Sequence, residues 1–216
     1  MSPDRLRELR EVVPDVSRET LDALVHFEAV FRKWAPAINL AAPSALEQLW
    51  TRHILDSAQL LALQPQATRW LDLGSGGGFP GIVTAILLKP RSNARVDLVE
   101  SAGKKAAFLR TVVADMSLPA VVHNKRIEAL EPSELSYPQV VTARALAPLP
   151  ALLGLVWPWI GMGSIGLFQK GRDYSRELAQ SRDEWSFEVI EHRSVTDADA
   201  AILQISALRP LRDRGV

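Results

Sequence analysis

The chain has 216 residues, of which 47% are hydrophobic and 23% charged, and its formal net charge is zero. This composition is typical of a globular protein with a full core, and the net charge indicates no general preference for a polyanion. The absence of cysteine excludes disulfides, thiolate zinc sites and cysteine nucleophiles.

Residues 1–66 predict a helical N-terminal extension. The opening MSPDRLRELREVV is charged and has no apolar segment typical of a secretory signal, so we expect a cytoplasmic protein. Two apolar stripes recur at helical spacing, and residues 35–44 between them predict a loop in which Ser44 is a helix N-cap and Glu47 completes a capping box. The stripes contain Leu21, Leu24, Val25, Phe31 and Trp34, and then Leu46, Leu49, Trp50, Ile54, Leu55 and Leu61.

Residues 67–216 predict an α/β domain. Short apolar strands alternate with helical segments, a pattern that favours a mostly parallel sheet with helices on both faces. The last two predicted strands are joined by a polar turn, which favours an antiparallel hairpin at the C-terminal end. The predicted strands are 69–74, 95–100, 120–124, 139–146, 164–170, 185–195 and 200–210, and the predicted helices are 81–88, 101–116 and 151–160.

A charge-free stretch between Arg144 and Lys170 is long enough to raise the question of a membrane span. Prolines and glycines interrupt it repeatedly, so we expect a loop, a buried helix, a turn and a buried strand instead, and no membrane contact.

The segment WLDLGSGGGFPG places five glycines within eight residues, where the first strand passes into a helix. In an open parallel sheet a ligand lies at the carboxyl ends of the strands, and glycine allows the backbone to approach it closely. The letters GGGFPG satisfy a dinucleotide fingerprint, but the match begins two residues late. The alternative frame, Asp72-x-Gly74-x-Gly76-x-Gly78, is the pattern associated with S-adenosylmethionine, in which Asp72 serves the ammonium of the ligand directly or through water.

Glu100 ends the second predicted strand. A carboxylate at this strand tip can accept hydrogen bonds from both hydroxyls of a ribose. Because NAD sites use the same device, Glu100 indicates an adenosine-type ligand without choosing the cofactor.

Six segments occur in an order that identifies a known family: RHILDS, LDLGSGGGFPG, VES followed by KK and FL, NKRIE, TARAL and QKG. Together they resemble the glucose-inhibited division protein B family, the 16S ribosomal RNA (guanine-N7) methyltransferases. The resemblance implies a Rossmann-like class I methyltransferase that uses S-adenosylmethionine to methylate N7 of a guanine in the 530 loop, near the decoding site. Its partner would be 16S rRNA or the small ribosomal subunit, and we expect a monomer without a metal.

The resemblance also implies that Gly74 and Phe79 of the glycine loop contact the cofactor and that Ile127 and Glu128 lie beside the adenine. It implies that Arg144 lies at the cofactor and at the substrate. Two positions depart from the family, since Ala35 and Ala41 stand where polar residues are usual, which weakens any prediction for the N-terminal loop. The predicted cofactor-binding residues are Asp72, Gly74, Ser75, Gly76, Phe79, Glu100, Ser101, Ile127, Glu128 and Arg144.

The chemistry of guanine N7 fits this sequence. Its lone pair is nucleophilic at neutral pH and no proton must leave before attack, so we assign no general base. Our hypothesis is that Arg144 positions the guanine or an adjoining phosphate; the alternative is a structural arginine that pairs with a carboxylate.

Basic residues follow the carboxyl ends of the predicted strands, so we expect them to bind RNA phosphates at the rim of the cofactor site; the alternative is a set of scattered surface charges. His53 and Asp56 lie one helical turn apart, and we favour a polar strut between the extension and the sheet over direct catalysis. The predicted RNA-binding residues are Lys104, Lys105, Arg126, Lys170 and Arg172.

Two alternative functions stay open at this point. The first is a methyltransferase that acts on a small molecule or a protein, and the second is a nucleotide-binding redox or interaction module that reuses GGGFPG.

Overall fold

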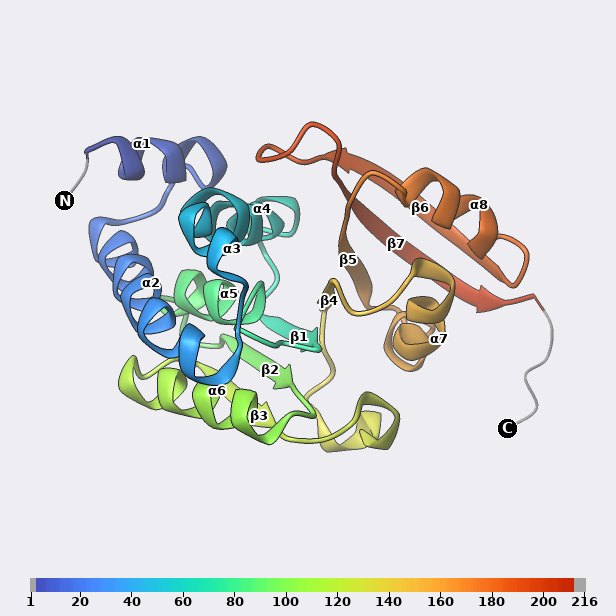
Figure 1. The fold of residues 1–216 in the computed structure, drawn as a ribbon. Helices are drawn as coiled ribbons and strands as arrows, with labels where there is room; N and C mark the ends of the chain where they lie inside the picture. The colour runs from blue at the N-terminus through green and yellow to red at the C-terminus, as the bar shows by residue number, and fades with distance from the viewer. Residues whose placement is uncertain (1–2, 212–216) are drawn as a thin grey trace.

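Seven strands form one sheet with helices on both faces in the computed structural model, which describes residues 3–211 (Figure 1). The order is β3-β2-β1-β4-β5-β7-β6; the first five strands are parallel, and β7 runs antiparallel to both β5 and β6. The predicted fold class and C-terminal hairpin are therefore confirmed. The strands are β1 (Arg69–Leu73), β2 (Arg95–Val99), β3 (Ala120–His123), β4 (Val140–Arg144), β5 (Ile165–Lys170), β6 (Trp185–Arg193) and β7 (Ala201–Pro210).

The helices cover both faces of the sheet. Within residues 3–211 none of them is long and apolar enough to cross a membrane, and the charge-free stretch folds into α7 and β5. They are α1 (Pro3–Val12), α2 (Arg18–Ile38), α3 (Pro43–Glu47), α4 (Asp56–Leu63), α5 (Gly81–Leu88), α6 (Gly103–Asp115), α7 (Leu149–Ile160) and α8 (Tyr174–Ser181), with a π-helical turn η1 (Trp50–Leu55) and 3-10 turns η2 (Ile127–Ala129) and η3 (Pro132–Glu134).

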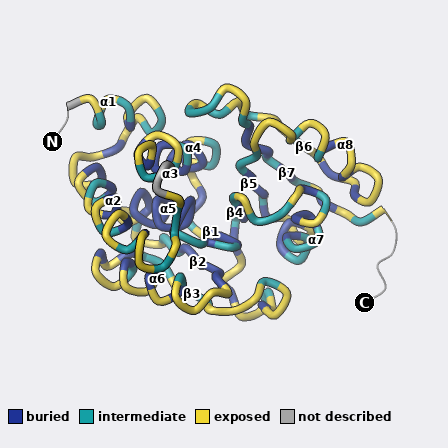
Figure 2. Tube along the Cα trace, viewed as in Figure 1, coloured by how far each residue is buried: buried dark blue, intermediate teal, exposed yellow. Residues whose placement is uncertain are grey.

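Alternating side chains of the strands feed two hydrophobic clusters. Trp70 joins the cluster beneath α2, α4, α5 and α6, whereas Leu71 and Leu73 join the cluster beneath α7. This alternation is the period of two that a strand buried on both faces requires. All eight residues of α5 are buried, which makes it the central helix of its layer (Figure 2).

The N-terminal helices share a core with the sheet. Buried side chains of α2 and α4 belong to the same cluster as those of α5 and α6. The division into residues 1–66 and 67–216 stays a prediction, and residues 1–2 and 212–216 of those ranges lie outside the described part of the chain.

Three local predictions are wrong. The helix α2 continues through Pro36 to Ile38 before Asn39 ends it with a φ of 54°, because burial of Ala35 outweighs the missing proline N–H. The helix α3 begins at Pro43, a residue suited to the first helical turn, so Ser44 lies inside the helix and is not its N-cap.

The predicted strand 139–146 is also too long. It ends at Arg144 because Ala145 has a φ of 50°, which no strand accommodates. The helix α8 was not predicted, since its polar sequence has few apolar positions to reveal a period.

Candidate active site

The backbone that follows β1 lies at the carboxyl ends of the parallel strands. Gly74 and Gly76 have φ angles of 70° and 52°, a region that favours glycine. The N–H of Gly76 donates to Glu100 Oε2 at 2.8 Å, and a Cβ at Gly76 would meet only Gly74 O within 4 Å, at 3.6 Å. The loop therefore presents bare backbone to the space in front of it.

Glu100 connects the tips of β1 and β2. Besides the N–H of Gly76 it accepts the N–H of Ala102 through Oε1 at 2.7 Å, and its residue is 8% exposed. These two bonds fix the carboxylate at the edge of the cavity, where each oxygen keeps a lone pair for a ligand hydroxyl.

Asp72 lies beneath the loop and not at the cavity surface. Its Oδ1 accepts the hydroxyl of Thr142 at 2.7 Å and its Oδ2 accepts the N–H of Gly81 at 3.2 Å. Burial raises the pKa of Asp72 to about 6. Ser75 is buried as well and donates its hydroxyl to Asp72 O at 3.0 Å. Both residues support the loop from below, and a direct role of Asp72 at a ligand stays a prediction.

A cavity of about 420 Å³ opens in front of this loop. It brings together six of the predicted cofactor residues, and Lys105 and Arg126 from the predicted RNA-binding set. Two carboxylates and five apolar residues line it, a mixture suited to a nucleoside with polar hydroxyls and a flat base. The lining consists of Gly74, Gly76, Val99, Glu100, Ser101, Lys105, Lys125, Arg126, Ile127, Glu128, Ala145, Leu146 and Leu155.

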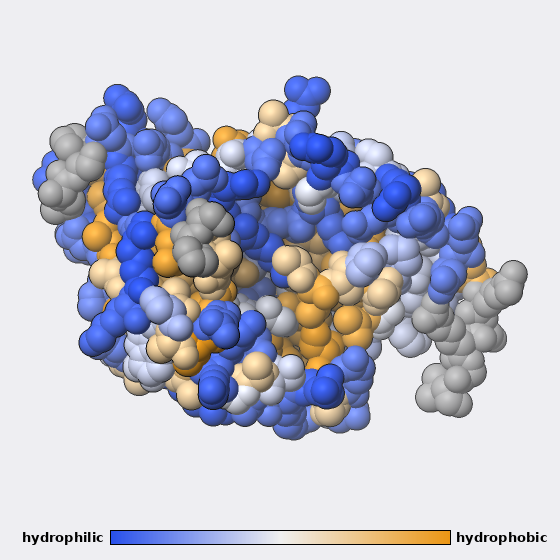
Figure 3. Space-filling model, in the orientation of Figure 1, coloured by the Kyte–Doolittle hydropathy of each residue, from blue (hydrophilic) through white to orange (hydrophobic). Residues whose placement is uncertain are grey.

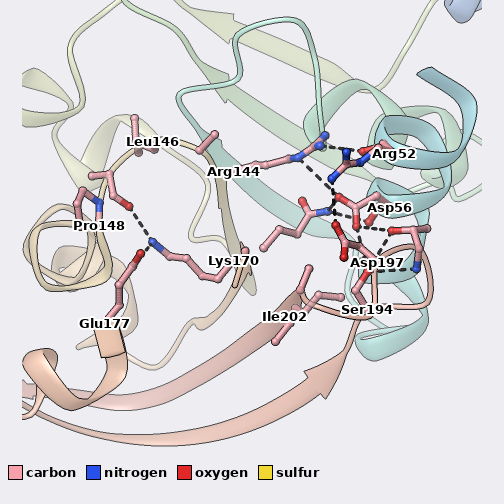
Figure 4. Close-up of a pocket in the computed structure, with 17 residues that line it drawn as sticks. Arg52, Asp56, Arg144, Leu146, Pro148, Lys170, Glu177, Ser194, Asp197 and Ile202 are labelled. Carbon is pink, nitrogen blue, oxygen red and sulfur yellow. Dashed lines mark hydrogen bonds and ion pairs between the residues drawn. The ribbon is translucent and has the colours of Figure 1, made fainter. Parts of the chain in front are cut away.

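A second cavity of about 540 Å³ adjoins the first, because Ala145 and Leu146 line both (Figure 4). Leu146 lies at the boundary between the two cavities and packs closely against the glycine loop. A Cβ built on Gly74 would lie 2.7 Å from Leu146 Cδ1. On the face of the molecule seen in Figure 3, hydrophobic surface lies beside α7 and hydrophilic residues cover α8. Charged and apolar residues both line the second cavity, and Arg144 and Lys170 are the predicted site residues that it contains.

Arg144 is held by the turn η1. Its Nη1 donates to His53 Nδ1 at 2.9 Å, its Nη2 donates to Arg52 O at 2.7 Å, and its Nε lies 3.6 Å from Asp56 Oδ2. A guanidinium can only donate, so His53 Nδ1 must be the acceptor and the imidazole carries its proton on Nε2. Burial, and then Arg144 and Arg52, lower the pKa of His53 to about 4, and burial also lowers the pKa of Arg144.

Asp56 joins three segments that are far apart in the sequence. Its Oδ2 accepts the side-chain amide of Gln169 from β5, and its Oδ1 accepts the Thr196 hydroxyl from the β6–β7 turn at 3.0 Å. Gln59 of α4 donates to the same Oδ1 at 2.7 Å. Burial raises the pKa of Asp56. These contacts form a polar strut between the N-terminal helices and the sheet.

Phe79 lines neither cavity. It is 9% exposed and packs against Phe27, Phe31 and His53, with ring centroids 5.3, 5.1 and 5.1 Å apart. A cofactor contact of Phe79 stays a prediction; what the side chain does here is fix the loop to α2.

Three predicted RNA contacts have different surroundings. Lys170 is nearly buried, and its ammonium donates to Ala147 O and Glu177 Oε2, each at 2.8 Å. Arg172 pairs with Asp199 at 3.1 Å at the surface, and Lys104 is exposed on α6. The basic residues therefore do not form one free rim around the cofactor cavity.

Sequence reasoning missed most of the second cavity. Gln169 had a local signal, since it is a polar residue at the end of an apolar strand. Glu177 and Asp197 had none, because they lie in polar segments, and nothing in the segment RHILDS indicated a place for Arg52 at a cavity. A cluster of three or more histidine, aspartate or glutamate side chains that could hold a metal ion is not found in the part of the chain described.

Comparisons with known proteins agree with this geometry. The family model described as rRNA small subunit methyltransferase G matches residues 20–206. Proteins with the name Ribosomal RNA small subunit methyltransferase G in Brucella canis and Brucella suis biovar 1 are each 58% identical over 214 residues, which cover 99% of this chain and all of the relative.

Solved structures share the fold. The SAH-bound methyltransferase PaMTH1 of Podospora anserina has a TM-score of 0.62 at 13% identity, over 86% of this chain and 87% of the other. The precorrin-6y C5,15-methyltransferase of Geobacter metallireducens has a TM-score of 0.50 at 14% identity, over 70% and 85%. At these identities the likeness concerns the fold alone. The family model and the Brucella relatives go further, and the chain belongs to the rRNA small subunit methyltransferase G family.

Proposed function

We propose that this chain is an S-adenosylmethionine-dependent methyltransferase that methylates N7 of a guanine in the 530 loop of 16S rRNA. The observation that carries the proposal is the pair of adjoining cavities at the carboxyl ends of β1, β2 and β4, one in front of the glycine loop and one beside Arg144. Family membership supplies the class of substrate.

The residues of the first cavity fit the cofactor. Glu100 is fixed at the strand tip with lone pairs for the ribose hydroxyls, and Ile127, Leu146 and Leu155 offer an apolar surface to a flat base. The bare backbone at Gly76 allows a ligand to come within contact of the loop. When bound, S-adenosylmethionine supplies a methyl group on a cationic sulfur.

The surroundings of Arg144 support a mechanism without a general base. His53 is the titratable group nearest to the guanidinium, and its acceptor nitrogen is already occupied by Arg144. Guanine N7 needs no base because its lone pair attacks directly and no proton is released. The protein then contributes alignment, an effect that can supply on the order of 7–11 kcal/mol. Arg144, held in place by η1, orients the base or a neighbouring phosphate.

The remaining proposals concern the RNA contacts, the N-terminal extension, the oligomeric state and the compartment. Lys104, Lys105, Arg126 and Arg172 contact RNA phosphates. Residues 1–66 form a helical extension whose turn η1 holds Arg144 of the methyltransferase domain, residues 67–216. The enzyme works as a monomer in the cytoplasm, where it meets the small ribosomal subunit.

The test is methyl transfer to ribosomes. Small subunits purified from cells that lack the gene are incubated with the enzyme and S-adenosylmethionine, and N7-methylguanine is mapped by cleavage of the RNA chain at the modified base. We expect one cleavage site, in the 530 loop. Label that enters protein or small molecules but not RNA would support the alternative substrate class and overturn the proposal.

A further inference from the structure

The second cavity has a position and a chemistry that the cofactor does not need. It borders the first cavity at Ala145 and Leu146, so that a base held in it would lie next to the transferable methyl group. Enzymes that modify a base commonly take it out of the stack into such a pocket. On the basis of the proposed function, we infer that this cavity receives the flipped guanine and that Glu177 reads its Watson–Crick edge.

The orientation of the guanine in the cavity follows from the reaction at N7. Guanine carries the acceptors N7 and O6 on one edge. The donors N1–H and N2–H₂ lie on its Watson–Crick edge. If N7 points to the cofactor cavity, the donor edge points into the second cavity, away from the cofactor. A pocket that selects guanine therefore needs a free acceptor in its lining, and adenine would be rejected there because its N1 is itself an acceptor.

Three carboxylates line the cavity, and two of them are already engaged at both oxygens. Asp56 accepts from Gln59 and Gln169 through different oxygens. Asp197 accepts from Arg52 through Oδ2 and from the N–H of Asp199 through Oδ1, each at 3.0 Å. Each of these four oxygens already accepts a bond from the protein.

Among the three carboxylates of this lining, Glu177 is the one with an oxygen that accepts no bond from the described residues. Its Oε2 accepts the N–H of Leu149 at 2.7 Å and the ammonium of Lys170 at 2.8 Å, while Oε1 accepts from no group within residues 3–211. Figure 4 places Glu177 and Lys170 opposite Arg144, across the cavity. The start of α7 and the end of β5 thus hold the carboxylate in advance, which is the arrangement that recognition of a fixed edge requires.

The first experiment uses substrate and enzyme changes together. Small subunits are reconstituted with guanine or with inosine, which lacks the N2 amino group, at the target position. Loss of a hydrogen bond to a charged group predicts that the wild type prefers guanine roughly 10- to 100-fold in kcat/KM. The variant Glu177→Gln keeps an acceptor for Leu149 and Lys170, and we expect it to lose this preference. Equal preferences in the two enzymes would overturn the assignment of Glu177, since a structural role leaves the ratio unchanged.

The second experiment fills the cavity. Gly171 lines it, and a Cβ there would meet nothing within 4 Å, so Gly171→Trp adds bulk without a clash in the fold. The control is Ala198→Trp, an exposed position in the β6–β7 turn that is not part of the lining. We expect Gly171→Trp to bind S-adenosylhomocysteine and the subunit within about threefold of the wild type, because phosphate contacts dominate RNA affinity, but to lose more than about 100-fold in kcat.

The outcomes distinguish a failure of the cavity assignment from a failure of the proposed function. Wild-type kcat in Gly171→Trp would overturn the assignment of the cavity while the proposed function stands. A wild-type enzyme that transfers no methyl group to small subunits would overturn the proposed function, and the cavity assignment would fall with it.

Discussion

The substitution Asp72→Asn tests the cost of the buried carboxylate under the glycine loop. Asp72 is 1% exposed, and burial raises its pKa from 3.8 to about 6. Between these two pH values the folded protein keeps a proton that the unfolded chain has lost, so stability falls as the pH rises through this interval. Above pH 6 the full cost is present, and the rise in pKa corresponds to about 3 kcal/mol.

Asparagine removes the charge and can keep both hydrogen bonds. Its side-chain oxygen accepts the N–H of Gly81, and its amide donates to the hydroxyl oxygen of Thr142, whose own proton can turn to Leu71 O at 3.4 Å. We therefore expect Asp72→Asn to be more stable than the wild type at pH 7, by up to about 3 kcal/mol.

The assay is urea unfolding of both proteins, without cofactor, from pH 4 to pH 8. The difference in free energy of unfolding should be near zero at pH 4 and should grow through pH 6, because all other titrating groups cancel. A difference that does not change with pH, or an asparagine variant that is less stable at pH 7, would refute the reasoning. Calorimetry with S-adenosylhomocysteine then separates stability from binding, since a weaker affinity in the variant is expected if Asp72 also serves the ligand ammonium.

Four further predictions concern the same site. Gly81→Ala should lose about 1–3 kcal/mol in urea unfolding, because the added Cβ would overlap the Leu98 side chain. Glu100→Gln leaves one of two backbone N–H groups without an acceptor, so its affinity for S-adenosylhomocysteine should fall by about tenfold in calorimetry; an unchanged affinity would contradict the role of this carboxylate. Arg144→Lys cannot reproduce the contacts made by two nitrogens, and its methyl-transfer rate should fall by about tenfold or more. Because the pKa of His53 is about 4, its ring signals in NMR should stay constant from pH 6 to pH 8, and a midpoint near 6.5 would show that the contact with Arg144 is broken.

Much of the fold was predictable because the signals are local. The strands that become β1 to β5 are short apolar runs bounded by breakers, and the positive φ angles at Gly74 and Gly76 follow from the density of glycine. The end of α2 was not predictable in this way. Pro36 normally indicates a helix boundary, and burial of the neighbouring Ala35 in the core decided otherwise.

Some residues of the candidate site could likewise be predicted from the sequence, and others could not. Residues that follow strand tips, such as Glu100 and Ile127, meet at one cavity because parallel strands end at one edge, and the order of the strands is enough to place them. The burial of Asp72 and the ion pair between Lys170 and Glu177 depend on which residues become neighbours in space. The spacing of residues along the sequence does not indicate these neighbours.

By itself, the sequence determined the parallel sheet, the glycine loop and the family, since each is indicated by short segments whose pattern can be recognised locally. The tertiary structure decided which polar groups are already paired and which still face a cavity. Arg144 is held by residues about ninety positions away, and the free oxygen of Glu177 exists because Leu149 and Lys170 take the other one. Hydrogen-bond capacity is used up by whatever lies nearest in space, and that is fixed only when the chain has folded.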